Sequence, residues 1–146
     1  MIKIRALEHV SWAAGDLEKA GPVLALFGFA PTGGEDIPAQ HVTSSYFASE
    51  CGMRMEVIRP LGADSQLHKF LAQRGPGLHH VCLEVDNLED ACAQVVGAGG
   101  QLVGETFSDS RGLHRFVHPK STGGLLIGLI ELHPELKQAA AAERAR

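Results

Sequence analysis

The chain has 146 residues, of which 45% are hydrophobic and 21% are charged, a composition typical of a soluble globular protein with its own core. The net charge of −4 excludes a strongly basic nucleic-acid-binding face and a polybasic membrane segment. No apolar run approaches the roughly 20 residues of a membrane helix, and no signal-peptide pattern opens the chain. Three scattered cysteines, Cys51, Cys82 and Cys92, fit neither a disulfide framework nor a zinc site built from cysteines. We therefore expect a cytoplasmic protein whose partner is a small molecule, without nucleic acid or membrane.

Two stretches of the chain match each other at an offset of 71 residues. ALEHVSWAAGDLEKA (6–20) aligns with GLHHVCLEVDNLEDA (77–91), and each reads as a strand, a turn and the start of a helix. Because the offset is about half the chain, it indicates a duplicated module and not a short-period repeat. The identical pairs are Leu7 and Leu78, His9 and His80, Val10 and Val81, Leu17 and Leu88, Glu18 and Glu89, and Ala20 and Ala91.

The first copy predicts a weak helix and then three strands. Asp16 can cap the helix, and its apolar stripe is Leu17, Ala20, Leu24 and Phe27. Gly21-Pro22 interrupts the helical pattern, so this helix is expected to be short, broken or restarted at Pro22. The strands that follow are expected at roughly 31–36, 41–49 and 52–59.

A short helix is expected between the copies, capped by Asp64 or Ser65. Its buried stripe is Leu67, Phe70 and Leu71. The second copy predicts a strand through Val85 and a helix capped by Asp86 or Asn87. That helix has the stripe Leu88, Ala91, Cys92, Val95 and Val96, and strands are expected after it at roughly 101–107, 112–118 and 124–132.

These elements predict an α+β fold built from two tandem βαβββ modules. We expect one domain over 1–134, with module one at 5–60, a linker helix at 63–75 and module two at 77–132. Residues 135–146 contain strong helix formers but few apolar anchors, which predicts a surface helix or a frayed end.

Strand alternation separates the two histidines of GLHHVCLEV. His79 falls on the face of Val81 and Leu83, which is expected to pack on helices, whereas His80 falls with Cys82 on the more polar face. The repeat pairs His80 with His9 and leaves His79 without a counterpart. A structural, hydrogen-bonded histidine is the alternative to a metal ligand at either position, and Cys82 is expected to be a small core residue.

A carboxylate falls on a corresponding face of another strand. In MRMEVIRPL, Glu56 alternates with Met55 and Val57 and therefore lies away from the predicted helix face. Two imidazoles and one carboxylate make a plausible site for a divalent metal. A solvated ion pair of Glu56 with Arg54 or Arg59 is the alternative.

Three segments carry a resemblance to a known family: LEHVSW, RPLGADSQLHKFLAQRGPGLHHVCLEVDNLEDA and HPKSTGG. They resemble the vicinal oxygen chelate superfamily, which includes glyoxalase I, extradiol dioxygenases and methylmalonyl-CoA epimerase, and they resemble the epimerases most. The resemblance spans roughly residues 5–132. It implies that the curved mixed sheets of the two modules form a cup around one metal ion.

The resemblance also implies ligands and partners. It places metal ligands at His9, Glu56 and His80, for a divalent ion such as Co, Mn, Zn, Ni, Mg or Fe. It implies a small carbonyl or acyl-CoA substrate and a homodimer. The segment HPKSTGG supplies Lys120 and Ser121 as candidate substrate contacts, with a simple turn as the alternative.

One departure affects the proposed chemistry. The family's fourth ligand, a glutamate on the last strand, corresponds to Gly128 here. Glu131 has the opposite parity and points outward unless a bulge occurs at Gly128. Gln40, His118 and Glu131 remain candidate acid–base residues.

Three functions follow from these observations. The first is a metal-dependent isomerase or lyase that stabilises an enolate, as an epimerase does. The second is another chemistry on the same fold, such as a glyoxalase-type lyase or a non-haem iron dioxygenase. The third is a small-molecule-binding protein without catalysis, which the glycine at position 128 favours.

Overall fold

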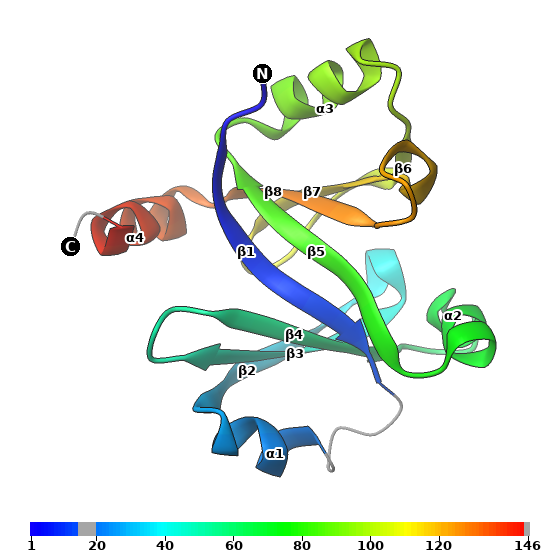
Figure 1. Ribbon diagram of the computed structural model, residues 1–146, viewed down its shortest axis with the longest axis vertical. Helices are drawn as coiled ribbons and strands as arrows, with labels where there is room; N and C mark the ends of the chain where they lie inside the picture. The colour runs from blue at the N-terminus through cyan, green and yellow to red at the C-terminus, as the bar shows by residue number, and fades with distance from the viewer. Residues whose placement is uncertain (15–19, 145–146) are drawn as a thin grey trace. The chain divides into compact units, whose positions relative to one another are not determined.

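The computed structural model describes residues 1–14 and 20–144, and it shows the predicted pattern of elements twice (Figure 1). The first copy comprises β1 (Ile4–Ala13), α1 (Ala20–Leu26), β2 (Phe29–Ile37), β3 (Val42–Ser49) and β4 (Arg54–Pro60). The second copy comprises β5 (Gly77–Val85), α3 (Leu88–Gly97), β6 (Leu102–Ser108), β7 (Gly112–Val117) and β8 (Ile127–Leu132). Helix α2 (Leu67–Arg74) connects the copies, and α4 (Pro134–Arg144) follows the second.

The chain divides into two compact units, which are described separately. The first unit contains residues 9–80, and the second contains residues 1–8 and 81–146. Both β1 and β5 therefore contribute one half to each unit. No helix of the described residues has the length and apolar character needed to cross a bilayer.

In the first unit, the strand order is β2-β3-β4-β1, with helices on both faces. Strands β2, β3 and β4 are antiparallel, while β1 runs parallel to β4 with Ser11 beside Glu56. On one face, Leu24 of α1 packs against Phe29, Phe47 and Val57. On the other face, Leu67 of α2 packs against Ala13 and Ile58.

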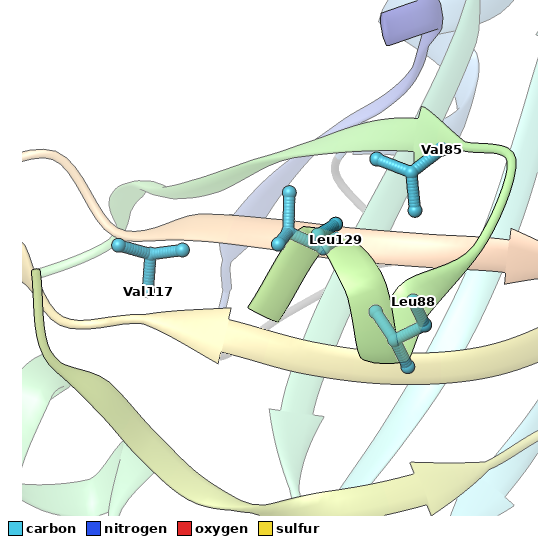
Figure 2. Packing of buried hydrophobic residues seen from close by; sticks show 5 residues of the cluster. Val85, Leu88, Val117 and Leu129 are labelled. Carbon is cyan, nitrogen blue, oxygen red and sulfur yellow. The ribbon is translucent and has the colours of Figure 1, made fainter. Parts of the chain in front are cut away.

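The second unit repeats this arrangement, with the strand order β5-β8-β7-β6. Strand β5 is parallel to β8, and β8 is antiparallel to β7. Figure 2 shows the core under α3, where Leu88 of the helix packs with Val85 of β5, Leu129 of β8 and Val117 of β7. On the opposite face, residues Leu136 and Ala140 of α4 pack against Cys82, Ile130 and Leu132.

Helix ends follow the predicted capping residues in part. Asn87 accepts a hydrogen bond from the backbone N of Asp90 at 2.7 Å and caps α3, whereas Asp86 pairs with Arg5 instead. Ser65 accepts a hydrogen bond from the N of Leu67 at the start of α2. Helix α1 is described over Ala20–Leu26 and includes Pro22, so the helix is short and contains the proline.

Two residues of the predicted apolar stripes are mostly exposed. Phe27 follows α1 and is 72% exposed, and Val96 of α3 is 55% exposed. Each was predicted from helical spacing, but α1 ends before Phe27, and Val96 lies away from the strands that α3 covers. The predicted cap Asp16 and the stripe residue Leu17 lie outside the described residues.

The tail forms helix α4 and contributes to packing through Leu136 and Ala140. Arg144 at its end forms a two-pronged ion pair with Glu84 of β5, with N–O distances of 2.8 and 3.1 Å. The tail is thus a surface helix that packs one side on the strands and is held at its end by an ion pair. The division into a single domain with a separate tail stays a prediction.

Candidate metal centre

The first unit brings together His9, Glu56 and His80, the three residues that repeat and alternation select. The Nε2 of His9 lies 3.4 Å from Oε2 of Glu56 and 3.4 Å from Nε2 of His80. The Nε2 of His80 lies 3.7 Å from the same oxygen of Glu56. One nitrogen from each ring and one carboxylate oxygen therefore converge on one point.

All three side chains are buried, with 6%, 5% and 5% of the residue surface exposed for His9, Glu56 and His80. Burial alone would raise the pKa of Glu56, but the contact with His9 and the electrostatic influence of His9 and His80 outweigh it and hold that pKa well below its usual range. Glu56 is therefore a carboxylate at neutral pH. Glu56 is buried beside His9, His80 and Ser44, so a fully solvated ion pair does not describe its surroundings.

The two oxygens of Glu56 have different environments. Ser44 of β3, which is fully buried, donates a hydrogen bond of 2.7 Å to Oε1. Oε2 is buried and accepts no hydrogen bond of normal geometry from the described residues. An acceptor buried in this way is costly unless a further group satisfies it.

The two rings of the GLHHVCLEV segment interact with each other. The Nδ1 of His79 lies 3.0 Å from the Nδ1 of His80, and the His79 ring packs edge-on against Phe70 of α2. Burial lowers the pKa of His79, so its ring is neutral at neutral pH. His79 is thus a packing residue, as alternation predicts, and also a hydrogen-bond partner of His80.

These donors suit a divalent metal ion. Two imidazole nitrogens and one carboxylate oxygen, all within 4.8 Å of one another, match the ligand types that such ions select. Oε2 of Glu56, which accepts no hydrogen bond of normal geometry, lies 3.4 and 3.7 Å from the two Nε2 atoms, and a cation held among the three atoms would balance its charge. The residues present therefore fit the group that the family resemblance implies.

The three candidate acid–base residues have local contacts within their own units. Gln40 lies in the 3₁₀ turn Pro38–Gln40 before β3, and an amide is not a general base. His118 caps the turn Pro119–Ser121, where its Nδ1 accepts a hydrogen bond from the N of Lys120. Glu131 accepts a hydrogen bond of 2.8 Å from the N of Leu88 and thus holds the start of α3. Their catalytic roles stay predictions without support from these contacts.

Strand β8 is regular at Gly128, so no bulge brings Glu131 to the opposite face. Gly128 pairs with Cys82 of β5 and with Phe116 of β7 without a register shift. A Cβ built on Gly128 would lie 3.2 Å from Sγ of Cys82 and 3.3 Å from Cε1 of Phe116. The space beside this glycine is therefore occupied by two neighbouring side chains.

The candidate substrate contacts lie in an exposed turn. Lys120 is exposed, and Ser121 accepts a hydrogen bond of 2.8 Å from the N of Gln101 through its Oγ. The turn thus anchors the start of β6, which is the simple turn role that the sequence allowed. A substrate contact at Lys120 or Ser121 stays a prediction.

Sequence reasoning missed Ser44 and the second role of His79. Strand alternation places Ser44 and Tyr46 on one face of β3, and the register pairs Tyr46 directly with Glu56. Alternation within 42–49 groups Ser44 with Tyr46, but only the pairing register of β3 with β4 places that face with Glu56, so the sequence alone carried no signal for this contact. The contact between His79 and His80 depends on ring orientation, which alternation does not give.

A second buried pair lies in the other unit. The Oδ2 of Asp109 lies 2.9 Å from Nε2 of His114 on β7, and Phe107 of β6 stacks on the histidine ring. The Oδ1 of Asp109 accepts hydrogen bonds from the N of Arg111 and of Gly112. Asp109 therefore fixes the tight β6–β7 turn and the histidine at once.

Comparison with known proteins agrees with this geometry. The family model of the glyoxalase/bleomycin resistance protein/dioxygenase superfamily matches residues 8–118. The mitochondrial methylmalonyl-CoA epimerase of Mus musculus is 34% identical over 134 residues, which cover 87% of this chain and 73% of that protein. The ethylmalonyl-CoA/methylmalonyl-CoA epimerase of Cereibacter sphaeroides is 31% identical over 135 residues, which cover 86% of this chain and 97% of that protein.

A solved structure supports the same assignment. The crystal structure of methylmalonyl-CoA epimerase from Mycobacterium tuberculosis superposes with a TM-score of 0.84 at 29% sequence identity. The match covers 92% of this chain and 93% of that one. The predicted α+β fold is therefore confirmed.

Proposed function

This chain belongs to the glyoxalase/bleomycin resistance protein/dioxygenase superfamily, and on that basis we propose that it is a metal-dependent isomerase of an acyl-CoA substrate. His9, Glu56 and His80 would hold one divalent ion. The relatives named as methylmalonyl-CoA epimerases support the substrate class, because they match most of this chain.

The observation that carries the proposal is the unsatisfied Oε2 of Glu56 between two imidazole nitrogens. A buried carboxylate with both rings directed at the same oxygen is the geometry of a cation site. A bound divalent ion supplies Lewis acidity, which stabilises the negative charge that develops on a carbonyl oxygen when the neighbouring α-proton leaves.

Proton transfer needs a group of this chain on the same face as Glu56. We assign it to Glu35 of β2, because the register places Glu35 beside Ser44 and Ser44 contacts Glu56. Glu35 is half-buried, and the hydroxyl of Tyr46 donates a hydrogen bond of 3.0 Å to its Oε1. This tyrosine orients the carboxylate, which can accept the α-proton from one face of the substrate. Return of that proton to the same face gives exchange alone, and isomerisation is completed when a proton is returned to the opposite face of the enolate.

A second candidate function has its own supporting observation. The space beside Gly128 is occupied by Cys82 and Phe116, so the last strand offers no carboxylate where the family resemblance implies one. The absence of a carboxylate at position 128 is what we would expect of a protein that binds a metal and a small molecule but does not transfer a proton. The two functions differ in exchange of the substrate α-proton.

The first experiment measures metal content. Wild-type protein, purified without an affinity tag for metals, is expected to contain one equivalent of a divalent metal by elemental analysis, and His80→Ala is expected to lose it. His68→Ala is the matched control, since His68 is an exposed histidine of α2 whose ring contacts the backbone O of Gly62. Equal metal in wild type and His80→Ala would contradict the proposed site.

The second experiment measures catalysis. Methylmalonyl-CoA incubated with the protein in heavy water is expected to exchange its α-proton for deuterium, as followed by mass spectrometry. His80→Ala is expected to abolish the exchange, and His68→Ala to retain it. Stoichiometric metal and substrate binding without exchange would instead establish the binding protein.

A further inference from the structure

We infer that His79 is a positioning residue that fixes the tautomer and ring orientation of His80 through the contact between their two Nδ1 atoms. The inference rests on the proposed metal site, in which His80 binds through Nε2. It gives a role to the one histidine of the pair that has no counterpart in the repeat.

The His79 ring has two aromatic neighbours, His80 and Phe70. Its Nδ1 lies 3.0 Å from the Nδ1 of His80, and the ring centroids of the two histidines lie 5.3 Å apart at an interplanar angle of 79°. Phe70 of α2 contacts the ring edge-on at a centroid distance of 4.9 Å. Phe70 of α2 thus limits the rotation of the His79 ring, and the His79 ring in turn limits the rotation of the His80 ring.

The hydrogen bond links the protonation of the two rings. A contact between two Nδ1 atoms requires one donor and one acceptor, because two neutral acceptors or two N–H groups would repel. If His79 donates, the Nδ1 of neutral His80 is the acceptor, and its Nε2 carries the proton. If His80 donates, its Nε2 is unprotonated and faces Glu56 and His9 with a lone pair.

A metal ligand at Nε2 of His80 therefore needs His79 as the acceptor. The neutral His79 ring then carries its own proton on Nε2. In this arrangement His79 is not itself a ligand, but its hydrogen bond keeps the Nε2 of His80 free of a proton and able to bind the metal. Ligating histidines generally donate their second N–H to such a partner, and loss of that partner typically weakens metal binding 10- to 100-fold.

The experiment separates hydrogen bonding from packing. His79→Phe keeps an aromatic ring against Phe70 and removes the acceptor, while His79→Asn removes the ring and keeps an acceptor close to the position of Nδ1. Titration with Co²⁺ is expected to show affinity reduced about 10- to 100-fold in His79→Phe and within about threefold of wild type in His79→Asn. Thermal unfolding of the metal-free proteins is expected to give the reverse order, because the ring contributes packing.

A spectroscopic readout tests the tautomer directly. In the Zn²⁺-loaded wild type, side-chain ¹⁵N NMR is expected to show His80 protonated at Nδ1 and not at Nε2, with the Nδ1 proton protected from exchange. In His79→Asn this proton is expected to remain protected, and in His79→Phe it is expected to exchange rapidly.

The outcomes distinguish this inference from the proposed function. If wild type binds no Co²⁺, the metal site itself is wrong, and the inference is lost with it. If wild type binds Co²⁺ and His79→Phe binds it equally well, only the role of His79 is overturned. Weaker binding in both variants, in the order of their thermal stability, would show that His79 acts by packing alone and would also overturn it.

Discussion

Gly128 and Cys82 are direct neighbours across the parallel strands β8 and β5, and a Cβ on Gly128 would lie 3.2 Å from the Sγ of Cys82. Phe116 closes the same space from β7, at 3.3 Å from that point. Both distances are shorter than ordinary van der Waals contact. Packing against Cys82 and Phe116 therefore favours a glycine at this buried position, independently of any role in catalysis.

Substitution of Gly128 by alanine is expected to destabilise the protein. The added methyl group must displace Cys82 or Phe116, and overpacking of this kind costs about 1–3 kcal/mol of unfolding free energy. Urea unfolding of wild type and Gly128→Ala measures this loss of unfolding free energy. Gly97→Ala in α3 is the control, because a Cβ there meets no atom within 4 Å, and it is expected to stabilise the helix by about 0.5–1 kcal/mol.

The double variant Gly128→Ala/Cys82→Ala tests the cause of that destabilisation. Removal of the sulfur makes room for the methyl group, so the two substitutions together are expected to cost less than the sum of the two separately. Purely additive effects would show that the Sγ of Cys82 is not the obstacle.

The hydrogen bond from Ser44 to Glu56 is expected to contribute to metal affinity. Ser44→Ala leaves Oε1 of Glu56 without its donor, so the carboxylate can rotate away from the geometry that directs Oε2 at the histidines. We expect Co²⁺ affinity to fall about 10-fold in calorimetric titration. Ser45→Ala is the matched control, because Ser45 follows on the opposite face of β3, and it is expected to leave the affinity unchanged. Equal effects of the two substitutions would contradict the role of Ser44.

The three residues of the candidate metal centre could be selected from the sequence because two periodicities coincide. The 71-residue repeat pairs His9 with His80, and alternation places both on the less apolar face of their strands. Alternation in MRMEVIRPL does the same for Glu56, and the structure places one atom of each within 4.8 Å of the others. The opposite parity of Glu131 was predicted in the same way, because β8 is a regular strand.

The surroundings of the metal centre depend on features that single-strand patterns do not contain. The position of Ser44 beside Glu56 follows from the pairing register of β3 with β4, which tertiary packing sets. The contact of His79 with His80 depends on ring rotation against Phe70 of α2. Phe27 was assigned to a helix that ends at Leu26, and helix ends are the part of a sequence prediction with the weakest signal.

The pair of Asp109 and His114 is expected to make stability depend on acidic pH. Burial would raise the pKa of Asp109, but the hydrogen bond and charge of His114 and the backbone N–H groups of Arg111 and Gly112 outweigh it and lower that pKa. A carboxyl whose pKa is lower in the folded protein stabilises the fold fully above its unfolded pKa of about 3.9, and this contribution is lost as pH falls through the folded value.

Asp109→Asn is therefore expected to reduce the loss of unfolding free energy that wild type shows as pH falls below about 4, measured by urea unfolding across the acidic range. His114→Phe is the partial counterpart, since it keeps an aromatic ring stacked on Phe107 and leaves the two backbone donors in place. It is expected to reduce this pH dependence less than Asp109→Asn does. A pH dependence in Asp109→Asn equal to that of wild type would show that this carboxyl does not contribute.

Glu35 is expected to be essential for exchange of the substrate α-proton. Glu35→Gln keeps the side-chain shape and an oxygen that can accept the hydrogen bond from Tyr46, but it cannot take up a proton. Loss of a general base typically lowers the rate about 10²- to 10⁴-fold, so exchange of methylmalonyl-CoA in heavy water is expected to fall by that factor while metal content is retained. Asp36→Asn is the matched control, because Asp36 is the next residue on β2, faces away from Ser44 and accepts a hydrogen bond from Thr43. If Glu35→Gln exchanges as fast as Asp36→Asn, another group transfers the proton, and Tyr46 orients a carboxylate that takes no part in the reaction.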